Sequence, residues 1–241
     1  MELNPTPGAR RELTSRNQPW AQKLARRVAD TGITPNTISL FSVFFSAGAA
    51  YLLGWLSISR DWSGGSAALC YLIAAVCIQL RLLCNLLDGM VAVECGKKSA
   101  TGGIFNEAPD RLADVMLLVA AGRLAGDFPG PHLPPGWIAA VLAMGTAYIR
   151  ALGGTLTGTQ NFMGPMAKQH RMFWLTLACL VSAAVVVKVG PAGPQVLWVW
   201  VAAFSWILLG SVVTCARRLK EIARLMKSQA AAAGVPVPPS S

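Results

Sequence analysis

The chain has 241 residues, of which 54% are hydrophobic and only 13% are charged, and its mean hydropathy is +0.48. Soluble domains carry about 25% charged residues, so this composition argues against an ordinary soluble enzyme, and the apolar content excludes disorder over most of the chain. The formal net charge is +10. In so apolar a chain this excess indicates cationic loops beside a membrane and disfavours a nucleic-acid partner.

A basic stretch precedes the first apolar segment. Within residues 19–30, Trp20, Leu24 and Val28 recur at helical spacing, and cationic side chains occupy the other faces. This pattern is typical of an amphipathic helix that lies on an anionic lipid surface, and a short solvated helix is the alternative. The first 30 residues lack the apolar core of a cleavable signal peptide.

Six apolar segments follow in chain order. A membrane-spanning helix needs about 20 mostly apolar residues. The candidate spans are 37–58, 66–89, 107–125, 135–154, 171–189 and 195–216. The third is the weakest because its first turns are acidic. The sequence therefore predicts an all-α integral membrane protein with six transmembrane helices and an N-terminal interfacial amphipathic helix. Its expected parts are a basic N-terminus (1–33), a six-helix domain (34–216) and a basic C-terminal tail (217–241).

The basic residues alternate across these spans. Eighteen of the 21 Lys and Arg residues fall toward the ends that six alternating spans would place on one side of the membrane. Only Arg60, Arg123 and Lys188 fall at the opposite ends. The positive-inside rule then predicts a multi-pass protein of a bacterial-type inner membrane with both termini in the cytoplasm.

Acidic residues gather where the second span ends and the third begins. Five of the eleven lie within 27 residues, at Asp88, Glu94, Glu107, Asp110 and Asp114. A carboxylate at a helix end that faces or enters the bilayer is costly and therefore marks a functional site. Carboxylates that converge in apolar surroundings need a cation, and hard divalent ions such as Mg²⁺ or Mn²⁺ suit oxygen ligands.

Helical spacing indicates which of these side chains can meet. Asn85 and Asp88 stand at i and i+3 on one face of the second span. Asn106, Asp110 and Asp114 step by four along the third span, and the face rotates by about 40° per step. The Gly-containing segment between the spans would let a ligand approach the backbone closely, as a bed for a diphosphate beside a metal site requires.

Residues 85–110 resemble the signature of the CDP-alcohol phosphotransferase family, D-x2-D-G-x2-A-R-x8-G-x3-D-x3-D. The aligned positions are Asn85, Asp88, Gly89, Ala92, Val93, Gly102, Asn106 and Asp110, and every spacing fits. Six transmembrane helices, an N-terminal amphipathic helix and a Thr-Pro-Asn start to the first span are also similar to that family. The resemblance covers about residues 19–216 and implies the same six-helix membrane fold.

Three positions depart from the signature. The first and third aspartates are Asn85 and Asn106, and the usual Arg is Val93. Asparagine coordinates through its carbonyl oxygen but brings no charge, so two negative charges are missing from a site that holds two divalent ions in the family. The alternatives are a rewired two-metal site in which Glu107 and Asp114 compensate, a single-metal site, and an inactive relative.

The resemblance implies a transferase that moves a phosphatidyl group from a CDP-alcohol, first of all CDP-diacylglycerol, to a hydroxyl of a polar acceptor and releases CMP. It implies Asp110 as general base and Asp88 as the chief anionic metal ligand. The metal set for one or two Mg²⁺ or Mn²⁺ ions is Asn85, Asp88, Asn106, Asp110 and Asp114. Gly89, Ala92 and Gly102 would line the CDP pocket, the site would face the cytoplasm, and a homodimer follows by analogy alone.

Cationic residues at the ends of the fourth and fifth spans are similar to the acceptor region of family members that use phosphorylated polyols, such as phosphatidylglycerophosphate and phosphatidylinositol phosphate synthases. These residues are Arg150, Lys168 and Arg171. Arg binds phosphate bidentately. The alternative is positive-inside charge with snorkelling side chains. Arg81, one turn before Asn85, is expected to pair with a carboxylate such as Asp114 or with a lipid phosphate.

Three other functions stay open at this point. A transferase could use a soluble CDP-alcohol and diacylglycerol, in which case alanine at the acceptor cations would spare activity. A cation transporter would need polar residues along several spans to the far side, whereas these gather near one face. A catalytically altered or inactive relative that binds CDP-lipid fits the two asparagines.

Overall fold

The computed structural model describes residues 18–59, 62–93, 95–97, 100–126 and 134–232. Within these ranges all regular secondary structure is helical. The helices are α1 (Pro19–Asp30), α2 (Pro35–Ile58), α3 (Gly64–Val93), α4 (Gly102–Gly122), the single-turn η2 (Arg123–Ala125), α5 (Pro135–Thr157), α6 (Lys168–Val189) and α7 (Pro194–Ala232).

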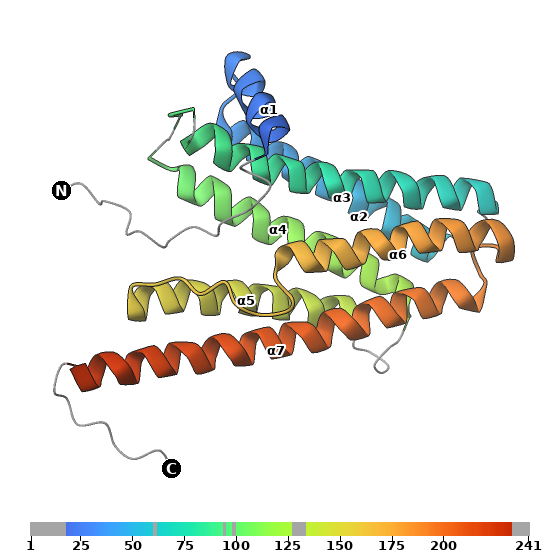
Figure 1. Cartoon of the computed structure of the whole chain (residues 1–241). Helices are drawn as coiled ribbons and strands as arrows, with labels where there is room; N and C mark the ends of the chain where they lie inside the picture. The colour runs from blue at the N-terminus through green and yellow to red at the C-terminus, as the bar shows by residue number, and fades with distance from the viewer. Residues whose placement is uncertain (1–17, 60–61, 94, 98–99, 127–133, 233–241) are drawn as a thin grey trace, which may run out of the picture.

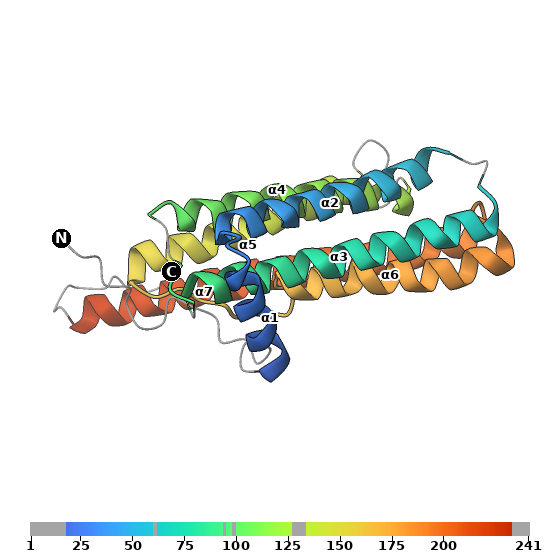
Figure 2. The ribbon, with the colours of Figure 1, turned by 90° about the horizontal axis from the view of Figure 1, so that it is seen from above.

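The long helices run along one common direction, and α1 lies across one end of the bundle (Figure 1). From above, α2 and α4 lie on one side of the bundle and α3 and α6 on the other (Figure 2). Helix α2 packs against α3 and α4, α3 packs against α6, and α5 packs against α4 and α7. Helices α2, α4 and α6 begin, and α3, α5 and α7 end, toward the end of the bundle that carries α1 (Figure 1).

The predicted helices agree with this architecture. Each predicted span falls on one long helix, and the predicted interfacial helix has the bounds of α1. Among the described helices, α2, α3, α5, α6 and α7 are long and apolar enough to cross a membrane. Helix α4 falls short of that hydropathy because its N-terminal half is charged, as its acidic first turns predicted. The chain is a helical multi-pass membrane protein, and its described part contains no other regular secondary structure.

The last helix is longer than the predicted sixth span, which ended at residue 216. Helix α7 continues past Ala216 to Ala232, so residues 217–232 prolong the last helix. Residues 1–17 and 233–241, together with Glu94 and Arg60, lie outside the described residues.

Local sequence explains where the first helices begin and how α1 is held. The Thr34 side chain accepts a hydrogen bond from the backbone N–H of Thr37 at 3.2 Å, and Pro35 occupies the first turn of α2. Helix α1 buries a stripe of three alanines, at positions 21, 25 and 29, against the C-terminal part of α3. Lys97 donates to the carbonyl of Ala29 at the end of α1. Trp20 of α1 is half-exposed and lines the site described below.

Helices α4 and α5 cross at Gly122 and Gly136 without room for a side chain. A Cβ on Gly136 would overlap the carbonyl oxygen of Leu118, and a Cβ on Gly122 would overlap the backbone of Gly136. Small residues at a helix crossing let two backbones approach closely within a membrane. This contact fixes α5 against α4 and therefore sets the spacing of the site at the other end of these helices.

Replacing Gly136 tests the crossing. Gly136→Ala is expected to force α5 away from α4 and to lower the free energy of unfolding by about 1–3 kcal/mol. Gly65→Ala is the matched control, because a Cβ there meets no atom within 4 Å. Thermal unfolding of the detergent-solubilised protein measures both variants. Equal Tm values for the two would contradict the close crossing.

Candidate functional site

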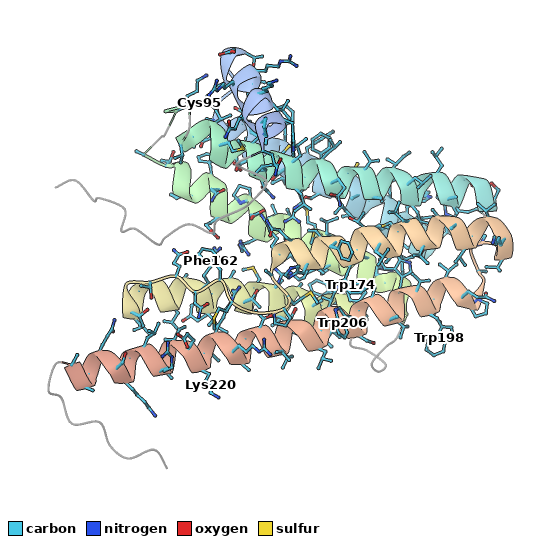
Figure 3. All side chains as sticks on the ribbon, viewed as in Figure 1. Cys95, Phe162, Trp174, Trp198, Trp206 and Lys220 are labelled. Carbon is cyan, nitrogen blue, oxygen red and sulfur yellow. The ribbon has the colours of Figure 1, made fainter. Side chains whose placement is uncertain are left out.

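A cavity of about 690 Å³ opens at the α1 end of the bundle. Helices α1 to α7 all contribute to its lining. Ten of the eleven predicted site residues line it: Asn85, Asp88, Gly89, Ala92, Gly102, Asn106, Asp110, Arg150, Lys168 and Arg171. In Figure 3, Phe162, which lines the cavity, is labelled at this end of the bundle and Trp198 toward the opposite end. The eleventh residue, Asp114, is buried one turn further along α4.

Asp88 is buried in the last turns of α3, with 3% of its surface exposed. Its Oδ2 accepts a hydrogen bond from the hydroxyl of Ser39 on α2 at 2.7 Å. Its Oδ1 is buried and has no hydrogen-bond partner. The sequence did not single out Ser39, because nothing local separates it from Ser42 and Ser46 on the same buried face of α2.

Asp110 lies on the cavity wall and is surrounded by donors from three helices. Lys168 Nζ donates to its Oδ2 at 2.5 Å. Asn85 Nδ2 donates to its Oδ1 at 2.9 Å, and Arg81 Nη2 reaches the same oxygen at 3.4 Å. Arg111 Nη2 stands 3.6 Å from Oδ2. This carboxylate therefore joins α3, α4 and α6.

Asp114 binds two buried guanidinium groups. Arg81 Nη2 lies 2.5 Å from its Oδ1, and Arg171 Nη2 lies 2.9 Å from its Oδ2. All three residues are almost fully buried. Pairing of Arg81 with Asp114 is one of the two arrangements that the sequence allowed. Arg171 also donates to the carbonyl of Met166 at 3.0 Å, so this predicted acceptor residue has protein partners on its guanidinium.

The wall formed by α4 and α5 carries a second, more exposed ion pair. Arg150 Nη2 lies 2.5 Å from Oε1 of Glu107, whose side chain is 50% exposed. The Arg150 guanidinium also sits over the ring of Phe162, 5.5 Å from its centroid. Phe162 belongs to the segment that joins α5 to α6, and sequence reasoning missed it because an aromatic residue in a connecting loop carries no periodic signal.

The segment between α5 and α6 is held down so that it lines the cavity. Gly158 ends α5 with φ of 73°, and Gly164 has φ of 122° and lies against Thr214 of α7. Both angles favour glycine over other residues. The backbone N–H of Met166 donates to Thr214 Oγ1 at 2.9 Å. This anchor positions Lys168 two residues later, at the first turn of α6.

The donor atoms fit a divalent ion at one place better than at others. Asp88 offers a buried unpartnered oxygen, and Asn85 keeps its amide oxygen for other contacts because its nitrogen faces Asp110. Both oxygens of Asp110 and of Asp114 already accept from cations. In the described part of the chain, no group of three or more His, Cys, Asp or Glu side chains is placed to hold a metal ion. Four of the five predicted metal ligands line the cavity, and the fifth, Asp114, is buried against Arg81 and Arg171.

The fold and the cavity define a class: a multi-pass helical membrane protein with a charged pocket at one end of its bundle. No protein-family model matches the chain. A stretch of 106 residues is 28% identical to the inner membrane protein YnbA of Escherichia coli strain K12. It covers 42% of this chain and 48% of YnbA, so the match spans about half the length of that relative.

Solved structures of Mycobacterium tuberculosis phosphatidylinositol phosphate synthase (PgsA1) have the same fold. The structure with CDP-DAG bound is 20% identical, with a TM-score of 0.65 over 84% of this chain and 92% of that one. The complex with manganese and citrate is 19% identical, with a TM-score of 0.63 over 84% and 88%. The resemblance predicted from the signature is confirmed at the level of the fold. At 19–20% identity, this likeness shows the shared fold.

Proposed function

We propose that the protein is a membrane transferase that moves a phosphatidyl group from CDP-diacylglycerol to a hydroxyl of a polar, phosphorylated acceptor and releases CMP. The observation that carries the proposal is one cavity that collects the retained signature residues Asp88, Gly89, Gly102 and Asp110 together with cations of α5 and α6. The binding of CDP-DAG by the structural neighbour PgsA1 supports the choice of donor.

The charge of the cavity favours anionic ligands. Its lining includes the cations Lys97, Arg111, Arg150, Lys168, Arg171 and Arg218 and the carboxylates of Asp88, Glu107 and Asp110. An excess of one sign of charge in a cleft with apolar walls raises the local concentration of ligands of opposite charge. The diphosphate of a CDP-lipid and the phosphate of an acceptor are ligands of this kind.

Different residues of the cavity would bind the donor, bind the acceptor and move the proton. Asp88 would hold a divalent ion, and such an ion would offset charge on the diphosphate and on the leaving CMP. Gly89 and Gly102 leave room for the nucleotide at the backbone. Asp110 takes the proton of the attacking hydroxyl as general base, and Arg81 orients its carboxylate. Arg150 and Lys168 bind the acceptor phosphate.

We also propose that the cavity faces the cytoplasm. Among the described cations, Arg123 of η2 and Lys188 of α6 lie toward the far end, whereas the cations of the cavity lining lie at the α1 end. The positive-inside rule favours this orientation. It also places the cavity where a soluble acceptor can reach a lipid donor.

Release of CMP tests the proposed function. The purified protein is given CDP-diacylglycerol, Mg²⁺ or Mn²⁺, and a panel of polyols with and without a phosphate group. We expect release of CMP that depends on a phosphorylated acceptor and on the divalent ion. Absence of release with every acceptor, together with absence of CDP-diacylglycerol binding, would contradict the proposal.

Arg150→Ala separates the acceptor site from the donor site. The variant removes a charge-assisted contact to the acceptor phosphate, so the KM for the acceptor is expected to rise about 10-fold or more. The KM for CDP-diacylglycerol is expected to change little. Arg217→Ala removes an exposed cation next in sequence to the cavity residue Arg218 and is the matched control. If diacylglycerol were the acceptor, both variants would have wild-type kinetics.

A further inference from the structure

Asp110 is engaged in a way that leaves little place for a metal ion. Lys168, Arg81 and Arg111 all bring a positive charge within 3.6 Å of its oxygens. A divalent ion at the same carboxylate would face three cations at close range in a partly apolar cavity, where charges are weakly screened. The last aspartate of the signature is therefore neutralised by the protein itself.

Asn85 fits the same arrangement. Its amide nitrogen donates to Asp110 Oδ1 at 2.9 Å. The aspartate of the family signature at this position would place two carboxylate oxygens against each other, and such a pair needs a cation between them. The amide replaces that repulsion by a hydrogen bond. Asparagine at position 85 brings no negative charge, and Lys168 neutralises the charge of Asp110. Both features remove the need for a second cation beside Asp110.

Asp88 differs from Asp110 because one of its carboxylate oxygens has no hydrogen-bond partner. Its carboxylate is 3% exposed, lines the cavity and keeps Oδ1 without a hydrogen-bond partner. A buried carboxylate oxygen without a donor is costly unless a ligand satisfies it. Asn85, one turn earlier on the same helix face, has an amide oxygen to add. A hard cation at Asp88 would satisfy Oδ1.

We propose that the cavity holds a single divalent cation, at Asp88, and that the ammonium of Lys168 takes the place of a second ion at Asp110. An ammonium has three N–H donors, and one is used on Asp110. The others are available to a phosphate oxygen, so Lys168 bridges carboxylate and phosphate as a second ion would. The identity of that phosphate rests on the proposed function, whereas the number of ions does not.

Counting bound Mn²⁺ tests this proposal without any turnover. Full-length protein in detergent is titrated with Mn²⁺, and bound ion is measured by electron paramagnetic resonance and by calorimetry. We expect about one Mn²⁺ per chain in the wild type and in Lys168→Arg, which keeps the positive charge. Asp88→Asn is expected to bind none. The double variant Asn85→Asp with Lys168→Met restores a carboxylate and removes the cation, and is expected to bind about two.

Two Mn²⁺ ions in the wild type, or one ion that survives Asp88→Asn, would overturn the proposal. A folded double variant that still binds one ion would overturn it as well. If the double variant aggregates on size exclusion, the wild type, Lys168→Arg and Asp88→Asn decide the question. CMP release is measured in parallel. One bound ion without CMP release contradicts the proposed function alone, and two ions with CMP release contradict the ion count alone.

Discussion

Asp88→Asn is expected to lower the rate of CMP release by at least about 100-fold, because loss of a residue that only supports a metal ligand already costs about 10–100-fold. Asp88 is the signature carboxylate with a buried, unpartnered oxygen on the cavity wall. Asparagine has the same shape but lacks the charge that holds the divalent ion. The initial rate of CMP release at saturating CDP-diacylglycerol and acceptor measures the effect.

The hydroxyl of Ser39 provides the control for this variant. Ser39 donates to Oδ2 of Asp88, and an asparagine at position 88 can accept the same hydrogen bond, so the Tm of Asp88→Asn is expected to stay close to that of the wild type. Ser39→Ala removes the donor and leaves the carboxylate. Its activity is expected to fall less, and excess Mn²⁺ is expected to recover part of it. If Asp88→Asn retained more than about a tenth of wild-type activity, Asp88 could not be a direct ligand.

The sequence predicted the helices because most of them contain an apolar segment of about 20 residues. Pro35, Pro135 and Pro194 stand at or near the first turn of long apolar helices. The continuation of α7 beyond Ala216 was not predicted, because its basic residues read as a tail. Tertiary contacts maintain it: Ile222 lies against Gly153, and Gln229 donates to the carbonyl of Thr157 at 3.2 Å.

The site could be located by spacing but not fully assigned by it. Intervals of three and four along a helix placed Asn85, Asp88 and Asp110 on the cavity. The contacts of Lys168 with Asp110 and of Ser39 with Asp88 join residues 58 and 49 positions apart. Such contacts depend on how helices pack, which one sequence does not reveal.

Asp114 illustrates this limit most clearly. Steps of four residues grouped it with Asn106 and Asp110 as a metal ligand. Each step of four residues rotates the helix face by about 40°. Asn106 is therefore exposed, whereas Asp114, two steps later, points into the bundle and is fully buried. At that angle it meets Arg81 and Arg171 instead of the cavity. Its role as a metal ligand stays a prediction, and its ion pairs suggest a different test.

Asp114→Leu is expected to lower the free energy of unfolding by about 3–5 kcal/mol, because it leaves two guanidinium groups buried without their shared carboxylate. Replacing the whole group by apolar residues, with Arg81→Met, Asp114→Leu and Arg171→Met together, is expected to recover much of that loss. Thermal unfolding in detergent measures both. Glu221→Gln is the control, since the Glu221–Arg224 pair is solvent-exposed on α7 and its loss is expected to leave Tm close to the wild-type value.

The presence or absence of Mn²⁺ distinguishes the two roles of Asp114. If it supports the bundle through Arg81 and Arg171, Asp114→Leu destabilises the protein equally in Mn²⁺ and in EDTA, because neither ion pair involves the metal. If it is a metal ligand, the loss of stability appears mainly with Mn²⁺, since bound ion stabilises only the folded state that retains the site. The buried ion pairs lead us to expect the first result. An Asp114→Leu protein with wild-type Tm in EDTA would contradict the structural role and return Asp114 to the metal site.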